Sequence, residues 1–298
     1  MTDILSTCLL CHGRHLEHDH LAARQLNLAD SHGVARCSSC GLRFLNPRPT
    51  RQEYEDAYRE GTGLLAEAYP IPSRYYADED EARMPEYRTK LALLLRAEAG
   101  RRLLEIGACT GVFLNEARRR GFDVDGIEPS EANRRVAYSR FGLPLRPGLM
   151  EDQDIASESF NVVFSSNVFE HLLDPLAAAR RARRWLTPGG LLLLEVPNQF
   201  DSFAARRHRW LGRAKPRARS FLSVHHTVFF SRRTLRQLVV RAGLEPLHVR
   251  NVYYCSDSGL CRPLRLAGHL VGSFAGGSGV IEVLARNPAK PAVFSSGS

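Results

Sequence analysis

The chain has 298 residues, of which 44% are hydrophobic, and this size predicts one large core with a smaller satellite. Its longest apolar stretches, such as residues 191–194, fall far short of the roughly 18 residues of a membrane span. The start, MTDILSTC, lacks the basic flank and long apolar run of a signal peptide, so we expect a cytoplasmic protein. The formal net charge of +9 arises in the last 98 residues, which hold 16 basic and four acidic residues.

Four cysteines near the amino end form two C-x2-C pairs separated by 25 residues, Cys8 with Cys11 and Cys37 with Cys40. This spacing predicts a tetrahedral four-thiolate zinc site of the ribbon type. Disulfides are the alternative, but they form poorly in a reducing compartment, and a bridge within a C-x2-C pair would be strained. We therefore expect residues 1–50 to form a zinc ribbon whose stability depends on the metal.

Residues 51–95 are acidic and are expected to form a helical connector. Tyrosines recur along it, and each one is expected to pack the connector against the core. These are Tyr54, Tyr58, Tyr69, Tyr75, Tyr76 and Tyr87.

Residues 103–114, LLEIGACTGVFL, pass from a short apolar run through a glycine loop into helical periodicity. We expect a buried parallel strand over 103–106 and a helix over 112–120, joined where Gly107 and Gly111 let the backbone approach a ligand. Glu128 ends a second expected strand, 124–127, about 20 residues after the start of this turn, where Rossmann-like folds bind ribose hydroxyls. The pattern predicts a nucleotide-like ligand.

Glu105 indicates which ligand this is, because a carboxylate beside the loop would repel a pyrophosphate and attract a cation. S-adenosylmethionine carries an ammonium and a sulfonium but no phosphate. The segment resembles the first motif of the class I S-adenosylmethionine-dependent methyltransferases, with Cys109 in place of the middle glycine. The resemblance implies a Rossmann-like α/β sandwich and this cofactor. The residues it assigns to the cofactor here are Glu105, Gly107, Ala108, Gly111, Glu128 and Pro129.

Three later segments resemble further parts of the same family, so that the likeness covers residues 85–287. The fourth strand and its turn resemble residues 159–175, SFNVVFSSNVFEHLLDP. A helix end, a Pro-Gly-Gly turn and the fifth strand resemble residues 186–198, LTPGGLLLLEVPN. The helix before the last two strands resembles residues 230–245. The resemblance implies that Asn167 faces the methionyl group and that Met150 and Glu151 lie at the adenine. The expected methyltransferase domain is 96–290, followed by a disordered tail, 291–298.

Residues 37–50, CSSCGLRFLNPRPT, resemble the zinc ribbon that precedes some methyltransferases of sugar and secondary-metabolite pathways. In such enzymes, the region that follows the ribbon often caps the cofactor pocket. The resemblance therefore implies that residues 51–95 cap the pocket.

Methyl transfer demands little of side chains, because the sulfonium already activates the methyl group and only a poorly acidic acceptor needs a base. The candidate bases are His171, which the resemblance places at the site, and His225 and His226, with Glu170 as an alternative. Some related quinone-pathway O-methyltransferases carry a metal near a comparable Glu-His pair. Nothing else in this sequence completes such a site.

Arginines crowd an expected basic insertion, 199–227, after the fifth strand. Arg206, Arg207 and Arg209 would bind a phosphate or carboxylate of the substrate at the carboxyl edge of the sheet. The alternative is a solvated face in an arginine-rich chain, since it has 38 Arg and three Lys.

The sequence therefore predicts S-adenosylmethionine-dependent methyl transfer to a small or carrier-linked, anionic metabolite such as a nucleotide-activated sugar. Oxygen, nitrogen and carbon acceptors all remain open. A ribosomal RNA methyltransferase with a zinc module is one alternative, which the near-neutral ribbon with its single aromatic residue, Phe44, disfavours. A non-catalytic partner protein of the same fold is another, which the intact Glu105 and Glu128 disfavour.

Overall fold

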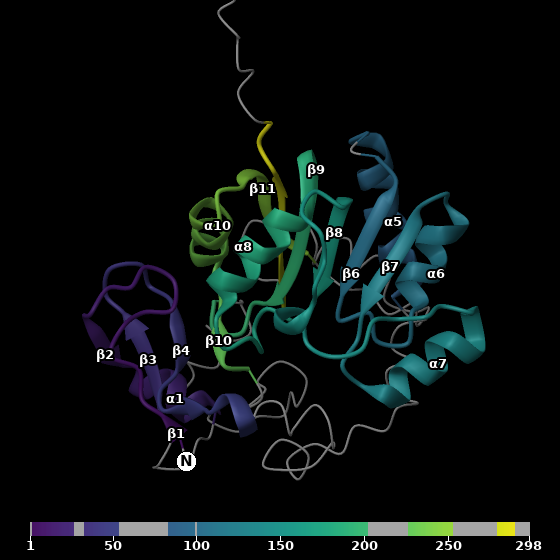
Figure 1. Ribbon diagram of the computed structural model, residues 1–298. Coiled ribbons are helices and arrows are strands. Elements are labelled where there is room, and N and C mark those ends of the chain that lie inside the picture. Colours follow the sequence, from purple (N-terminus) through teal and green to yellow (C-terminus); the bar gives the residue numbers. More distant parts are fainter. Residues whose placement is uncertain are drawn as a thin grey trace, which may run out of the picture.

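The computed structural model describes residues 2–26, 33–53, 83–98, 100–201, 226–252 and 279–289. Within these ranges the strands form sheets of six, four and two strands. Helices cover both faces of the six-stranded sheet, and a smaller module containing the amino-terminal strands lies beside it (Figure 1). The expected Rossmann-like α/β fold is confirmed.

The large sheet has the strand order β11-β12-β9-β8-β6-β7. Strands β9, β8, β6 and β7 run parallel, and β12 lies antiparallel between β9 and β11. The parallel strands therefore all end at one edge, and the loops that follow them converge there. The strands are β6 (Arg102–Ile106), β7 (Asp123–Ile127), β8 (Phe160–Ser166), β9 (Leu186–Pro197), β11 (Glu245–Val252) and β12 (Val280–Arg286).

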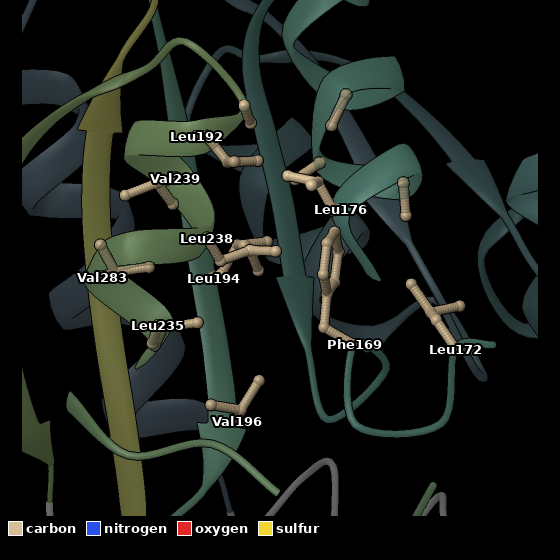
Figure 2. Close-up of a cluster of buried hydrophobic side chains, with 14 of the residues drawn as sticks. Phe169, Leu172, Leu176, Leu192, Leu194, Val196, Leu235, Leu238, Val239 and Val283 are labelled. Carbon is tan, nitrogen blue, oxygen red and sulfur yellow. The ribbon is translucent and has the colours of Figure 1, made fainter. Parts of the chain in front are cut away.

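Two apolar cores, one on each face, fill the space between the large sheet and its helices. On β9, Leu192 and Leu194 face the helices α8 and α10 (Figure 2). Leu191 and Leu193 join the other core, beneath α5 and α6. This alternation follows from the two-residue period of a strand buried on both faces. The helices are α5 (Met84–Arg96), α6 (Val112–Arg119), α7 (Glu131–Phe141), α8 (Pro175–Trp185) and α10 (Arg232–Arg241), with a short 3-10 helix, η1 (Met150–Asp152).

The Pro-Gly-Gly segment differs from the expected turn, because it lies inside β9. Phe160 pairs with Leu186 and Val162 with Leu191, so residues 187–190 stand opposite Asn161 alone. Gly189 accommodates this bulge with a φ of 81°. The chain thus passes from α8 into the sheet without a separate loop.

The small module contains the two-stranded and four-stranded sheets. Its four-stranded sheet has the order β10-β4-β3-β2, and β10 comes from the segment that follows residue 226 rather than from the amino-terminal region. The module and the large domain therefore share a sheet. The elements of the module are β1 (Thr2–Asp3), β2 (Leu16–His18), α1 (His20–Leu26), β3 (Val34–Cys37), β4 (Arg43–Leu45) and β5 (Arg48–Pro49). Strand β10 (Val228–Phe229) completes its four-stranded sheet from the later part of the chain.

Across the described ranges, no helix combines the length and apolar character needed to cross a membrane.

Candidate functional site

The glycine loop after β6 is held close to two neighbouring segments. The backbone N–H groups of Gly107 and Ala108 both donate to the carbonyl of Ile127, at 2.9 and 3.0 Å. Gly107 has a φ of 75°, and a Cβ at this position would lie 2.4 Å from Val168. The loop therefore requires glycine here, both for its backbone conformation and because the turn after β8 packs against it.

Glu128 lies at the end of β7 and is bound to this loop. Its Oε2 accepts a hydrogen bond from the N–H of Cys109 at 2.8 Å, and its Oε1 accepts from Ser130 N at 2.9 Å and Asn133 Nδ2 at 3.3 Å. The residue is only 6% exposed, and this burial raises the pKa of its carboxyl. Glu128 thus fixes the loop while it lies at the edge where ligands bind in open α/β sheets.

The other residues expected at the cofactor lie around the same edge. Glu105 is buried on β6 just before the loop, and Gly111 begins α6 in a left-handed conformation. Pro129 follows Glu128, and its carbonyl accepts a hydrogen bond from Arg134. Ala108 and Met150, also expected at the cofactor, are buried. Burial raises the pKa of the Glu151 carboxyl, and the N–H of Asn167 donates to the carbonyl of Glu195.

Two histidines and a glutamate converge beyond the turn that touches the loop. Nε2 of His171 and Nε2 of His226 lie 3.8 and 3.9 Å from Oε1 of Glu170, and the two rings are 4.9 Å apart in an edge-on arrangement. Glu170 is 1% exposed, and burial raises the pKa of its carboxyl to about 8. The structure therefore brings two candidate bases, separated by 55 residues in the chain, to one acidic group.

Gln199 favours one tautomer of the neutral His226 ring. Its Oε1 lies 2.6 Å from Nδ1 of His226, so the Nδ1–H donates to the amide oxygen. In the neutral ring the lone pair then resides on Nε2, which faces Glu170. This arrangement suits proton abstraction by Nε2.

The same three side chains also satisfy the spacing of a cation site, so the expectation that no other residue completes a metal site at the Glu-His pair was wrong. One donor atom from each of Glu170, His171 and His226 lies within 4.8 Å of the others. A carboxylate and two imidazoles are donors that divalent transition metals accept. The cluster can thus serve proton transfer or metal binding, and the two uses differ in whether purified protein carries a second metal ion.

The four cysteines of the small module meet in space. Sγ of Cys8 is 3.5 Å from that of Cys40, Sγ of Cys11 is 3.5 Å from that of Cys37, and all four atoms lie within 4.8 Å of one another. These separations are far longer than a disulfide and are close to the roughly 3.8 Å between thiolates around one tetrahedral zinc. The Cys40 thiol, hydrogen-bonded to Cys8, lowers the pKa of Cys8 to about 5.

Backbone donors support thiolate character in this cluster. The N–H of Leu10 donates to Sγ of Cys8 at 3.4 Å, and the N–H of Leu42 donates to Sγ of Cys40 at 3.5 Å. Both contacts stabilise negative charge on sulfur, as a metal-binding thiolate requires. The donor set and its geometry fit Zn²⁺.

Sequence reasoning missed a buried ion network next to Asn167. Nζ of Lys90 lies 3.0 Å from Oε1 of Glu195, and Arg83 lies 3.4 Å from Oε2 of Glu195 and 3.0 Å from the hydroxyl of Ser166. Lys90 and Glu195 are almost fully buried. The signal was present, because Glu195 interrupts a run of leucines and Lys90 lies on the apolar face of α5 with Leu91 and Leu94. Gln199 was missed too, and no local pattern marks it.

Several expected site residues lie outside the described residues. They are His225 and the arginines Arg206, Arg207 and Arg209, together with most of the connector 51–95, most of the basic insertion and the tail 291–298.

A hollow of about 590 Å³ lies at the other edge of the large sheet. Arg102, Asp123 and Phe160, which begin β6, β7 and β8, are among its lining residues. It therefore opens away from the glycine loop and does not correspond to the expected cofactor position.

Residues 76–249 match the model of a family described as Methyltransferase domain. This match covers more than half of the chain, so the chain belongs to that family. By class it is thus a methyltransferase-domain protein.

Among curated relatives, the chain is similar to the ubiquinone biosynthesis O-methyltransferase of Cereibacter sphaeroides, with 32% identity over 163 residues that cover 52% of this chain and 64% of the relative. It is 31% identical over 164 residues to the enzyme of the same name from Ruegeria pomeroyi, covering 51% and 63%. The chain thus spans less than two thirds of the length of these relatives.

Two solved structures share the fold. An S-adenosylmethionine-dependent methyltransferase from Mesorhizobium loti has a TM-score of 0.51 at 19% identity, covering 69% of this chain and 97% of that one. One from Archaeoglobus fulgidus has a TM-score of 0.50 at 14% identity, covering 71% and 99%. At these identities the likeness shows the fold alone.

Proposed function

We propose that this protein transfers a methyl group from S-adenosylmethionine to a small or carrier-linked anionic metabolite in the cytoplasm. A nucleotide-activated sugar is one such acceptor, and the name of the relatives adds an intermediate of ubiquinone biosynthesis. The carrying observation is the contact between Gly107 and Val168, because it places the glycine loop next to the turn that carries Glu170 and His171. A methyl donor bound at the loop would thus lie beside a proton acceptor.

The cofactor would lie along the carboxyl edge of the sheet. Glu128 would accept hydrogen bonds from the ribose hydroxyls, Glu105 and Asn167 would face the methionyl end, and Met150 with Glu151 would border the adenine. The bound cofactor supplies a methyl group that its sulfonium already activates. The protein's part is then to orient the acceptor and to remove its proton.

His226 is the proposed base for an acceptor hydroxyl. Gln199 holds its Nδ1–H, which leaves Nε2 to take the proton. The carboxyl of Glu170, 3.9 Å from Nε2, would stabilise the imidazolium that forms in the fraction of molecules in which Glu170 is ionised, because opposite charges attract at this distance.

The test combines cofactor binding with turnover. Calorimetry should show S-adenosylmethionine binding, and release of S-adenosylhomocysteine should be followed with 3,4-dihydroxybenzoate and with UDP-glucose as probe acceptors. His226→Gln should lower turnover of the accepted probe by about 10²- to 10⁴-fold with cofactor affinity unchanged. His15→Gln, at an exposed position in the small module, is the matched control.

Three results would contradict the proposal. Lack of cofactor binding by folded protein would remove the activity itself. Normal turnover in His226→Gln together with loss in His171→Gln would move the base to His171. A second metal equivalent that disappears in His226→Gln would instead assign the cluster to metal binding.

We also propose that Cys8, Cys11, Cys37 and Cys40 bind a structural Zn²⁺. Elemental analysis of protein purified under reducing conditions should find one zinc per chain, and Cys37→Ser should lose it. Protease resistance of residues 2–50 that is unchanged by zinc removal would show that the fold of the module does not depend on the metal.

A further inference from the structure

The hairpin that carries two of the four cysteines is also the partner of β10. Cys37 is the last residue of β3. Its N–H donates to the carbonyl of Leu42 at 2.9 Å, which closes the turn between β3 and β4. Strand β4 follows, with Phe44 paired to Val228 and the N–H of Leu45 donating to the carbonyl of Thr227 at 2.8 Å. The turn that carries Cys37 and Cys40 is thus separated from Thr227, the residue after His226, by the single strand β4.

The other side of β10 holds the turn with Glu170. The N–H groups of Thr227 and Val228 donate to the carbonyl of Glu170 at 2.8 and 2.9 Å. The hydroxyl of Thr227 lies 3.2 Å from this same carbonyl and 3.1 Å from that of Leu172. Thr227 therefore connects the backbone of His226 directly to the backbone of Glu170.

Two further contacts join the small module to this region. A guanidinium nitrogen of Arg48, on β5, donates to the carbonyl of Leu173 at the end of the same turn. Phe200, next to Gln199, packs edge-on against Phe229 with ring centres 4.9 Å apart, in an apolar cluster that includes Val34 and Leu45 of the module. Both segments that hold His226 thus contact the module.

The apolar core is continuous across the junction. Cys8, Cys37 and Phe44 of the module belong to the same buried cluster as Phe169, Leu172 and Val228. Phe44 and Val228 are fully buried. A rearrangement of the β3–β4 hairpin would therefore be transmitted to β10 through close packing.

We propose that the four-cysteine module is a structural part of the acceptor side of the active site, and that Thr227 is its positioning residue. The module holds β10 from one side, and β10 sets the relative position of His226 and Glu170 through Thr227. This inference rests on the proposed role of His226 and on metal binding by the cysteines. It assigns the zinc a consequence that lies outside the module, at the proton acceptor.

The first test removes the metal from the full chain with a chelator under reducing conditions and follows amide hydrogen exchange by mass spectrometry. Protection should be lost in residues 34–45 and also in residues 226–230 and 168–172. Strands β6 and β7, which share no sheet with the module, should keep their protection. The affinity for S-adenosylmethionine should change by less than about twofold, whereas turnover of the accepted probe should fall by about 10- to 100-fold, as expected for a misplaced base.

The second test uses variants that keep the metal. Thr227→Val removes the hydroxyl but keeps the branched shape, so it should lower kcat with little change in the KM of the cofactor and with full zinc content. Thr227→Ser restores the hydroxyl and should recover most of kcat. If Thr227 only stabilised the fold, kcat of the folded, zinc-loaded protein would not differ between these two variants.

Unchanged exchange in residues 226–230 after verified zinc loss would overturn the proposal, as would equal kcat in Thr227→Val and wild type. Failure of the proposed function has a different signature, because zinc-loaded wild-type protein would then show no cofactor binding while the exchange experiment still reports on coupling. Absence of zinc in the purified protein would overturn the metal assignment and this inference with it.

Discussion

Replacing Glu128 by glutamine is expected to weaken S-adenosylmethionine binding without unfolding the loop that the residue supports. A carboxylate offers about four lone-pair positions, and the donors on Cys109, Ser130 and Asn133 already use three of them. About one position is left for a ribose hydroxyl. The variant should therefore lose roughly one charged hydrogen bond, about 1.5–3 kcal/mol, or about 10- to 150-fold in Kd.

The stability of the same variant provides a second readout. A glutamine has one oxygen, so its amide group would meet the N–H of Cys109 or of Ser130 and leave that donor unpaired, at a cost of about 1–3 kcal/mol. Relief of the buried charge offsets part of this loss. A lowered Tm together with a raised Kd is expected, and Tm must be measured so that affinity is compared only in folded protein.

Titration calorimetry at fixed ionic strength is the assay, with Glu131→Gln as the matched control because that carboxylate is exposed and paired with Arg135. Burial raises the pKa of Glu128, so the carboxylate is lost earlier on acidification than in an exposed glutamate. Wild-type affinity should therefore fall as the pH is lowered, and that of Glu128→Gln should not. An unchanged Kd in folded Glu128→Gln, or stronger binding of a dinucleotide, would refute the assignment.

Two other predictions concern charge. The pKa of Glu170 is raised from 4.5 to about 8 in the folded protein, so the stability of the wild type should decline as the pH rises between these values. In Tm measurements, Glu170→Gln should show a flatter decline. A parallel decline in both proteins would contradict the prediction. Replacing Arg206, Arg207 and Arg209 by alanine should raise the KM of an anionic acceptor more than it lowers kcat, and added salt should affect the wild type more. An identical salt response in both proteins would indicate a solvated face.

Much of the fold could be predicted from the sequence, because its signals are local. The strand expected over 103–106 is β6, and the helix expected from Val112 is α6, which ends within one residue of the expected position. Apolar runs, positive-φ glycines and helical periods each depend on neighbours a few residues apart. The cysteine cluster was predictable for the same reason, since each C-x2-C pair forms a short turn of its own.

The geometry around His226 could not be predicted in this way. It depends on β10, a strand of two residues that is too short to show any period, and on β4, which lies more than 180 residues earlier in the chain. Pairing between such distant segments leaves no local trace. The sequence could therefore name His171 and His226 as candidates but could not show that both reach Glu170.

Buried glutamates at the carboxyl edge of the sheet differ in how their charge is compensated, and the difference separates their roles. Glu195 has Lys90 and Arg83 as cationic partners, so its charge is balanced by the fold. Glu128 has three N–H donors, which keep it oriented but leave its charge for a ligand that donates hydrogen bonds.

Glu170 has neither kind of support in the described part of the chain, where neither carboxylate oxygen finds a hydrogen-bond donor and the two histidine rings lie 3.8 and 3.9 Å from Oε1. A buried carboxylate that lacks donors is costly to ionise, so its proton responds strongly to any charge that forms nearby. Of the three, Glu170 is therefore the group whose protonation state would respond most to a positive charge on His226 during proton removal from the acceptor. Its backbone is held by Thr227, which keeps this responsive carboxyl at a fixed distance from the base.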